Sequence, residues 1–415
     1  MNKDLFMRNR KKFAEDMEDY SLAVFFAGEA KHRSADQEFG FTPNRNFYYL
    51  TGLDRQDFIL LLTKYNERVS ETLFILKPDF DIEKWTGIRL RKQEVEEISG
   101  VKNIMFVEDF EAYFNRNLQS NYYKNIYLDT EFRTVGFLSK GLDFAKHINA
   151  NFPYLNIKSG NQVVYDLRTI KEPEEVEEIK KAIQITKLGL ENIMEHMKPG
   201  LVERQIEAYF DFAIKYNGSM STSFKTIAAS GGNATVLHYE ENNCLTADLD
   251  LMLFDLGCEH NYYCSDISRT YPVNGKFTER QAEVYEAVLR VNEAMIEFAK
   301  PGVTWKEFNL KARDLLADEA IKLGLITDPI EIGKYYYHSI GHYLGLDVHD
   351  CGRYDQNERC FEAGMVITVE PGLYIAEENI GIRIEDNILI TEDGCINLSS
   401  DLIKSVQDIE EFMNK

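Results

Sequence analysis

The sequence predicts a mixed α/β (α+β) protein with two domains, a small α/β domain over residues 1–165 and a larger domain over residues 166–415. Two observations support this prediction. A chain of 415 residues exceeds the usual size of a single hydrophobic core. Short β-rich runs dominate the first part, whereas the second part twice repeats the order of two long helices followed by two strands.

The first domain is predicted from an alternation of short strands and helices. Strands are expected in SLAVFFAG, FYYLTGL, DFILLLT, ETLFILKP and NIYLD, and a helix near residues 89–98 falls between them. This part of the chain contains no dense cluster of histidines or cysteines. The sequence therefore directs attention to the second domain for the chemistry.

The second domain begins with a long helix whose two ends are marked in the sequence. Pro173 suits the first turn, and Lys-Pro-Gly at 198–200 ends the helix. The same tripeptide recurs at 300–302, after a helix that begins near Thr278, and each tripeptide precedes a second amphipathic helix. This weak internal repeat predicts a pseudo-twofold arrangement, with one central sheet, helices outside, and acidic residues converging at the axis.

Two acids lie at opposite ends of a predicted hairpin, DLGCEHNYYCSD, in which Gly257 and Asn261 favour a turn. A hairpin can bring Asp255 and Asp266 together. Two converging carboxylates repel each other unless a positive charge lies between them, and a hard divalent cation fits this position. On the hairpin alone, two solvated turn acids remain an equal alternative.

A second strand pair supplies two more acids. Glu370 ends the β-branched run of VITVEPGLY, and Glu385 lies inside the apolar strand pattern IGIRIEDNILI, where a lone acid is costly to bury. Between the two pairs, HSIGHYLGLDVHD places His338, His342 and His349 close together in a chain with only 8 histidines. Four carboxylates and an imidazole fit two divalent ions that share ligands and a bridging hydroxide.

These residues resemble a known family. The order Asp255, Asp266, His342, Glu370 and Glu385, with VLHYEEN before it and GLDVHD within it, resembles the metal-dependent aminopeptidase P and prolidase family of the pita-bread fold. The resemblance spans about residues 160–400, and TPNRNFYYLTGL more weakly resembles the smaller domain of bacterial aminopeptidase P. It implies that these five residues bind two divalent ions, with Mn2+ foremost and Co2+ or Zn2+ as alternatives.

The resemblance also implies roles around the metals. A hydroxide between two ions attacks the peptide carbonyl, and Glu370 relays the proton. His238 and His349 are expected to stabilise the substrate carbonyl in the tetrahedral intermediate. The remaining candidates are expected to form the wall of a proline pocket, and they are His338, Tyr374 and Arg383.

The implied reaction is hydrolysis of the bond between an amino-terminal residue and a following proline. The alternative is an Xaa-Pro dipeptidase, which needs a partner for the proline carboxylate. Arg353 is a candidate but follows GLDVHD in an apparent loop, so no dedicated partner is expected and longer peptides should be cleaved. A methionine aminopeptidase or a non-catalytic member of the fold is a weaker alternative.

Composition limits the partners and the compartment. The net charge of -22 argues against nucleic acids and anionic membranes. The opening MNKDLFMRNRKKF lacks an apolar core of signal-peptide length, and no later run approaches the span of a membrane helix. The 6 cysteines form no CxxC pair, which argues against a zinc cluster or disulfide framework. We therefore expect a cytoplasmic enzyme, and the family resemblance implies a homodimer or homotetramer.

Overall fold

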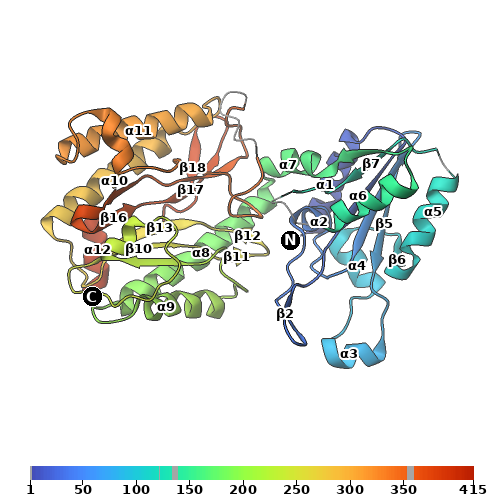
Figure 1. Cartoon of the computed structure of the whole chain (residues 1–415), viewed down its shortest axis with the longest axis horizontal. Coiled ribbons are helices and arrows are strands. Elements are labelled where there is room, and N and C mark those ends of the chain that lie inside the picture. Colours follow the sequence, from blue (N-terminus) through green and yellow to red (C-terminus); the bar gives the residue numbers. More distant parts are fainter. Residues whose placement is uncertain (1, 121, 133–138, 353–358) are drawn as a thin grey trace. The chain divides into compact units, whose positions relative to one another are not determined.

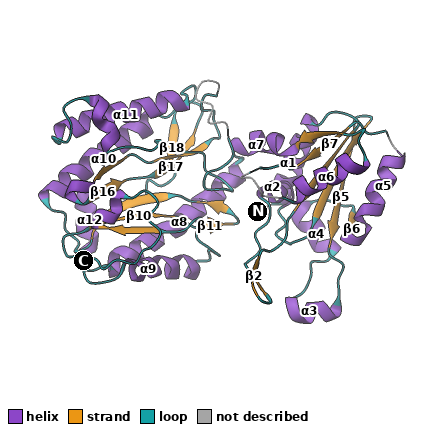
Figure 2. Cartoon of the chain, viewed as in Figure 1, coloured by secondary structure: helices purple, strands orange, loops and turns teal. Residues whose placement is uncertain are grey.

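The structure, a computed structural model, describes residues 2–120, 122–132, 139–352 and 359–415. The chain divides into two compact units, Met1–Arg168 and Thr169–Lys415, and both contain helices and strands (Figures 1 and 2). None of the helices in the described ranges is long and apolar enough to cross a membrane.

The first unit is built on a six-stranded sheet in the order β6-β5-β4-β1-β7-β8. Its strands are β1 (Ser21–Phe26), β4 (Ile59–Tyr65), β5 (Arg68–Ile75), β6 (Ile104–Phe106), β7 (Asn125–Leu128) and β8 (Asn156–Ser159), and β2 (His32–Ser34) and β3 (Gln37–Glu38) form a separate hairpin. The helices are α1 (Lys3–Asp16), α2 (Arg45–Thr51), α3 (Phe80–Thr86), α4 (Lys92–Ser99), α5 (Phe110–Ser120), α6 (Lys140–Asn151) and α7 (Gly160–Thr169). Strand β4 is antiparallel to β1 and β5, whereas β7 is parallel to β1.

Four of the five strands expected in this unit are confirmed as β1, β4, β5 and β7. The fifth expectation was wrong, because FYYLTGL lies mostly in helix α2. The Asn44 side chain caps this helix by accepting a hydrogen bond from the Phe47 amide at 2.8 Å. Gly52 ends the helix in the left-handed conformation, with φ of 69°. These caps outweigh the strand preference of the aromatic residues between them.

The second unit contains the two predicted pairs of helices, α8 (Pro173–His196) with α9 (Glu203–Tyr216), and α10 (Glu279–Phe298) with α11 (Trp305–Lys322). Pro173 starts α8, as predicted. Gly200 and Gly302 follow the first helix of each pair with φ of 85° and 89°, a conformation that glycine adopts without a steric penalty. A last helix, α12 (Val406–Met413), ends the chain.

The strands of this unit form several small sheets instead of the single central sheet that was expected. The three-stranded sheets are β13-β10-β9 and β14-β17-β18, and the two-stranded ones are β15-β16 and β11-β12. The strands are β9 (Ile227–Ser230), β10 (Leu251–Leu256), β11 (Glu259–His260), β12 (Tyr263–Cys264), β13 (Ile267–Pro272), β14 (Val366–Val369), β15 (Gly372–Ile375), β16 (Ile380–Arg383), β17 (Asp386–Ile390) and β18 (Cys395–Asn397). The Glu385 amide donates to the Ser268 carbonyl at 3.0 Å and links the two halves of the unit.

Candidate metal centre and substrate pocket

The predicted hairpin brings the first two acids together. Asp255 lies near the end of β10 and Asp266 immediately precedes β13, the strand that pairs with β10. The turn residues Asn261 and Tyr262 both have positive φ, of 48° and 67°. Gly257 is needed for a different reason, since a Cβ there would lie 1.9 Å from the Ser265 carbonyl oxygen.

The second pair of acids lies at strand ends. Glu370 directly follows β14, as expected. Glu385 was expected inside a strand but lies in the break between β16 and β17, where its amide turns to the Ser268 carbonyl. The break lets the chain change hydrogen-bonding partners, and it leaves the Glu385 side chain buried with 2% exposure.

His342 is held in the form that can bind a metal. Its Nδ1 lies 3.0 Å from the main-chain oxygen of Tyr343, and a carbonyl can only accept, so Nδ1 carries the proton. Its Nε2 is therefore the atom that faces the carboxylates, at 3.2 Å from Asp266 Oδ2 and 3.8 Å from Glu370 Oε1. Metal-binding histidines are commonly oriented by such a bond from the other ring nitrogen.

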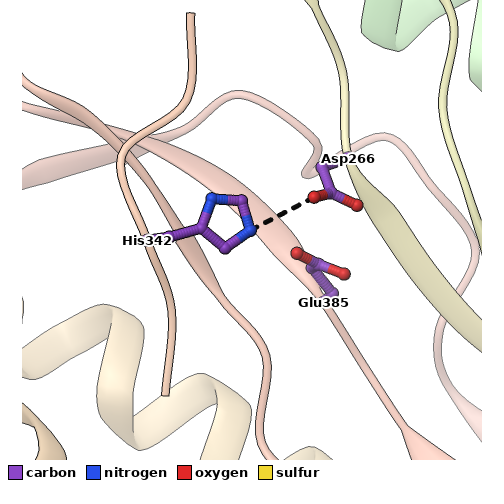
Figure 3. Close-up of side chains that lie close together, drawn as sticks. All are labelled: Asp266, His342 and Glu385. Carbon is purple, nitrogen blue, oxygen red and sulfur yellow. Dashed lines mark ion pairs between the residues drawn. The ribbon is translucent and has the colours of Figure 1, made fainter. Parts of the chain in front are cut away.

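Three of the five predicted ligands form a tight group. Asp266, His342 and Glu385 each offer a ligand atom within 4.8 Å of the others, and Figure 3 shows the three side chains pointing toward one another. Asp255 and Glu370 line the same pocket, whose volume is about 410 Å³. The structure thus brings all five predicted ligands to one pocket.

The converging carboxylates of this group need a cation to compensate their negative charge. Asp255 Oδ1, Asp266 Oδ1 and Glu385 Oε1 are buried and have no hydrogen-bond partner among the described residues. Burial, and then the neighbouring carboxylates, raise the pKa values of Asp266 and Glu385 well above their usual range. Orphaned, converging carboxylate oxygens beside an imidazole are the donor set of a divalent metal site, so the residues present fit the metal that the sequence predicted.

Arg383 connects the acids to the rest of the pocket. Its Nη2 donates to Asp255 Oδ2 at 2.7 Å, and its Nε donates to Ser268 Oγ at 2.7 Å. Ser268 Oγ in turn donates to Glu385 Oε2 at 2.8 Å. Arg383 Nη1 also donates to Tyr374 Oη at 2.9 Å, so one guanidinium positions groups on both sides of the site.

The three other predicted histidines lie around the pocket. His338 Nε2 is 2.8 Å from Tyr374 Oη, and burial and the charge of Arg383 lower the pKa of His338 to about 4. The rings of His349 and His342 have centroids 4.2 Å apart, and desolvation together with His342 lowers the pKa of His349 to about 4. The side chain of His238 is exposed and lines the same pocket.

Two supporting residues were missed by the sequence reasoning. Ser268 lies two residues after Asp266, so strand alternation could have placed it on the ligand face. Asn292, on α10, donates through its amide to the carbonyls of Val369 and Ile384, both at 3.2 Å, and these residues directly precede Glu370 and Glu385. No sequence signal pointed to Asn292. Arg353, the candidate partner for a substrate carboxylate, lies outside the described residues.

Residues 177–392 match the profile of metallopeptidase family M24, and residues 6–127 match that of the aminopeptidase P amino-terminal domain. The chain is also 33% identical to an Xaa-Pro aminopeptidase of Escherichia coli (strain K12), in an alignment covering 98% of this chain and 97% of the relative. The chain belongs to metallopeptidase family M24.

Solved structures agree with this family assignment. A Bacillus anthracis structure, provisionally described as an aminopeptidase P, is 45% identical with a TM-score of 0.97, and the match covers 100% of this chain and 99% of the other. The zinc-substituted E. coli aminopeptidase P in complex with product is 32% identical with a TM-score of 0.92, covering 100% and 98%. These likenesses confirm the predicted fold, a small α/β domain followed by a pita-bread catalytic domain, for this M24 peptidase.

Proposed function

We propose that this M24 peptidase is a metal-dependent Xaa-Pro aminopeptidase, which releases the amino-terminal residue of peptides that have proline in second position. The observation that carries the proposal is the convergence of the five predicted ligand side chains on one pocket, three of them with carboxylate oxygens that have no hydrogen-bond partner among the described residues. The full-length likeness to an enzyme named Xaa-Pro aminopeptidase supports the substrate class.

The proposed metal ligands are Asp255, Asp266, His342, Glu370 and Glu385. Two bound divalent cations would supply a Lewis acid and lower the pKa of the attacking water. We propose Mn2+, because ligation by four carboxylates and one imidazole suits a hard cation, with Co2+ or Zn2+ as alternatives. Asp255 is held by Arg383, Glu385 by Ser268 and His342 by the Tyr343 carbonyl, so three of the proposed ligands are oriented by neighbours.

Glu370 is the proposed proton carrier. It lies at the pocket with 17% side-chain exposure, which makes its carboxylate accessible to both water and substrate. As the new carbon–oxygen bond forms, Glu370 takes a proton from the water. It then gives that proton to the proline nitrogen as the carbon–nitrogen bond breaks, so that the leaving group departs as a neutral amine.

The pocket histidines are proposed to act on the substrate carbonyl and the proline ring. A neutral imidazole retains one N–H, so His238 and His349 can each donate a hydrogen bond to the oxyanion of the tetrahedral intermediate. The lowered pKa of His349, about 4, keeps that ring neutral at neutral pH. His338 and Tyr374, joined by a hydrogen bond and backed by Arg383, are proposed as the wall that contacts the proline ring.

Three further statements complete the proposal. The functional division is proposed to follow residues 1–165 and 166–415, with the catalytic residues in the second part. A cytoplasmic location is proposed from the composition and cysteine usage. A homodimer or homotetramer is proposed from the family resemblance alone.

The length of the accepted peptide tests the proposed activity. With Mn2+ added, we expect release of alanine from Ala-Pro-Gly at least as efficient, by kcat/KM, as from Ala-Pro, because Arg383, which lines the pocket, already donates to Asp255, Ser268 and Tyr374. The measurement is the initial rate of alanine release across a range of substrate concentrations. Efficient cleavage of Ala-Pro without detectable release from Ala-Pro-Gly would establish the dipeptidase alternative instead.

A further inference from the structure

The segment that carries His238 has little regular structure of its own. It connects β9 to β10, and before β10 begins its described backbone forms one short 3-10 helix, η2 (Gly231–Thr235), and an isolated bridge between Leu245 and Val202. His238 lies after this helix with an exposed side chain at the pocket. A ladder of main-chain hydrogen bonds therefore cannot fix the position of His238, and other contacts must do so.

The buried carboxylate of Glu203 accepts hydrogen bonds from this segment. Glu203 is the first residue of α9 and has 0% exposure. Its two oxygens accept five hydrogen bonds, which come from the Ser230 amide (2.8 Å), Ser230 Oγ (2.7 Å), Asn233 Nδ2 (3.0 Å), Tyr239 Oη (2.7 Å) and the Cys244 amide (2.9 Å). The donors lie at both ends and in the middle of residues 230–244, so this one side chain contacts the segment at 4 residues.

The hydrogen bonds make this buried charge favourable. Burial raises the pKa of the Glu203 carboxyl, but the hydrogen bonds from Ser230, Asn233 and Cys244 outweigh burial and lower it. No acceptor other than an ionised carboxylate of this shape can receive all five donors. An amide in its place would present an NH2 group to donors and leave some of them unsatisfied.

Tyr239 transmits this constraint to His238, its neighbour in the chain. The Tyr239 hydroxyl donates to Glu203 Oε2, while its ring packs in a buried cluster with Leu253 and Tyr374. Tyr374 is the residue that contacts Arg383 and His338 in the pocket. The residue beside His238 is thus fixed at both its polar and its apolar end.

We propose that Glu203 is a positioning residue for catalysis. Its carboxylate accepts hydrogen bonds from residues 230–244 and thereby holds His238 at the pocket. This proposal rests on the proposed role of His238 in stabilising the oxyanion. Glu203 contacts neither a proposed metal ligand nor the space where substrate would lie, so its effect must pass through the segment. Its loss should lower kcat and leave metal binding unchanged.

A double-mutant cycle separates this role from a general structural one. The four proteins are wild type, Glu203→Gln, His238→Ala and the double variant, all loaded with Mn2+ and assayed on Ala-Pro-Gly. His238→Ala should lower kcat roughly a hundredfold, the size typical of losing one oxyanion donor. Glu203→Gln should lower kcat at least about tenfold in wild type, because a small misplacement of a catalytic group is costly, yet change it less than about twofold when His238 is already alanine. Bound Mn2+ per chain should be unchanged in all four.

The outcomes distinguish the positioning role of Glu203 from the oxyanion role of His238. If the two effects multiply in the double variant, or if Glu203→Gln keeps wild-type kcat, the positioning role is wrong although His238 retains its own role. If His238→Ala alone keeps wild-type kcat, the proposed oxyanion role of His238 is wrong and the positioning role falls with it. Loss of Mn2+ in Glu203→Gln would indicate general damage to the site and would also overturn the inference.

Two further variants guard against simple misfolding. Tyr239→Phe removes only the hydroxyl, and it should lower kcat severalfold in wild type and not at all in the His238→Ala background. Glu207→Gln is the matched control one turn along α9, where Glu207 accepts a single bond from Asn242 Nδ2 at 2.9 Å that a glutamine oxygen can also accept. Glu207→Gln should keep wild-type kcat, and an equal loss in both glutamine variants would contradict the specific role of Glu203.

Discussion

Asp386 and Glu385 are neighbouring buried carboxylates with opposite surroundings. Asp386 accepts from Arg269 Nη2 at 2.7 Å and from Lys404 Nζ at 2.8 Å, and it has 0% exposure. Burial raises the pKa of Asp386, but the two cations outweigh burial and lower it to about 2. The protein itself therefore compensates this charge.

Glu385 receives no such compensation. One of its oxygens accepts from the neutral hydroxyl of Ser268, and the other has no partner among the described residues. Arg269 is close by, but its Nη1 donates to the main-chain oxygen of Glu385 at 2.5 Å and not to the carboxylate. Burial and then Asp266 raise the pKa of Glu385. Within this pair, Asp386 with its own cations serves the fold, and we infer that Glu385, left without them, serves a bound cation.

The largest effect on stability is expected from Asp386→Asn. This change keeps the shape but removes the charge that pairs with Arg269 and Lys404, and breaking a buried ion pair costs about 3 to 5 kcal/mol. We expect the urea-unfolding transition of the second unit to move to lower urea by a corresponding amount, with Mn2+ binding retained. An unchanged transition would mean that the pairing with Arg269 does not stabilise the fold.

A third buried carboxylate extends the comparison. Glu175 accepts from the neutral Tyr263 hydroxyl at 2.8 Å and from the Glu172 amide at 2.9 Å, while Lys171 and Asp350 are the charged groups that face it. Burial raises the pKa of Glu175 from 4.5 to about 7. Among the described residues Glu175 belongs to no cluster of three or more possible metal ligands, and its raised pKa favours uptake of a proton instead.

The pH dependence of stability follows from this shift. Between the unfolded pKa of 4.5 and the folded pKa of about 7, the folded state binds more protons, so stability falls as pH rises through this window. The loss reaches about 3 kcal/mol above the folded pKa. Glu175→Gln should remove this slope and raise the unfolding free energy at pH 8, as measured by urea unfolding across pH. A slope that persists in Glu175→Gln would assign it to another group.

Much of the second unit could be predicted because its signals are local. Pro173 and the two Lys-Pro-Gly endings mark helix ends, and an acid such as Glu385 in an apolar run is expensive enough to indicate a site. The wrong strand at FYYLTGL had readable contrary signals in Asn44 and Gly52, which cap the helix at its two ends.

Other features depend on contacts between distant parts of the chain. The break at Glu385 arises because its amide bonds to Ser268, and periodicity within one strand cannot reveal that change of partner. Glu203 and Asn292 resemble any polar residue of an amphipathic helix. Their roles come from donors and carbonyls 27 to 92 positions away, which no local pattern encodes.

The central claim is that Glu385 and Asp266 have no arginine or lysine partner among the described residues so that divalent cations bind there. Its most direct test is a titration of exhaustively metal-free protein with Mn2+, following bound metal, Tm and release of alanine from Ala-Pro-Gly. We expect the metal-free wild type to be inactive with a lowered Tm, and Mn2+ to restore both, because a ligand that binds only the folded state stabilises it. Glu385→Gln should bind less Mn2+ and recover little activity, whereas Asp386→Asn should bind Mn2+ as wild type does. Full activity of the metal-free protein, or equal Mn2+ binding by Glu385→Gln, would contradict the claim.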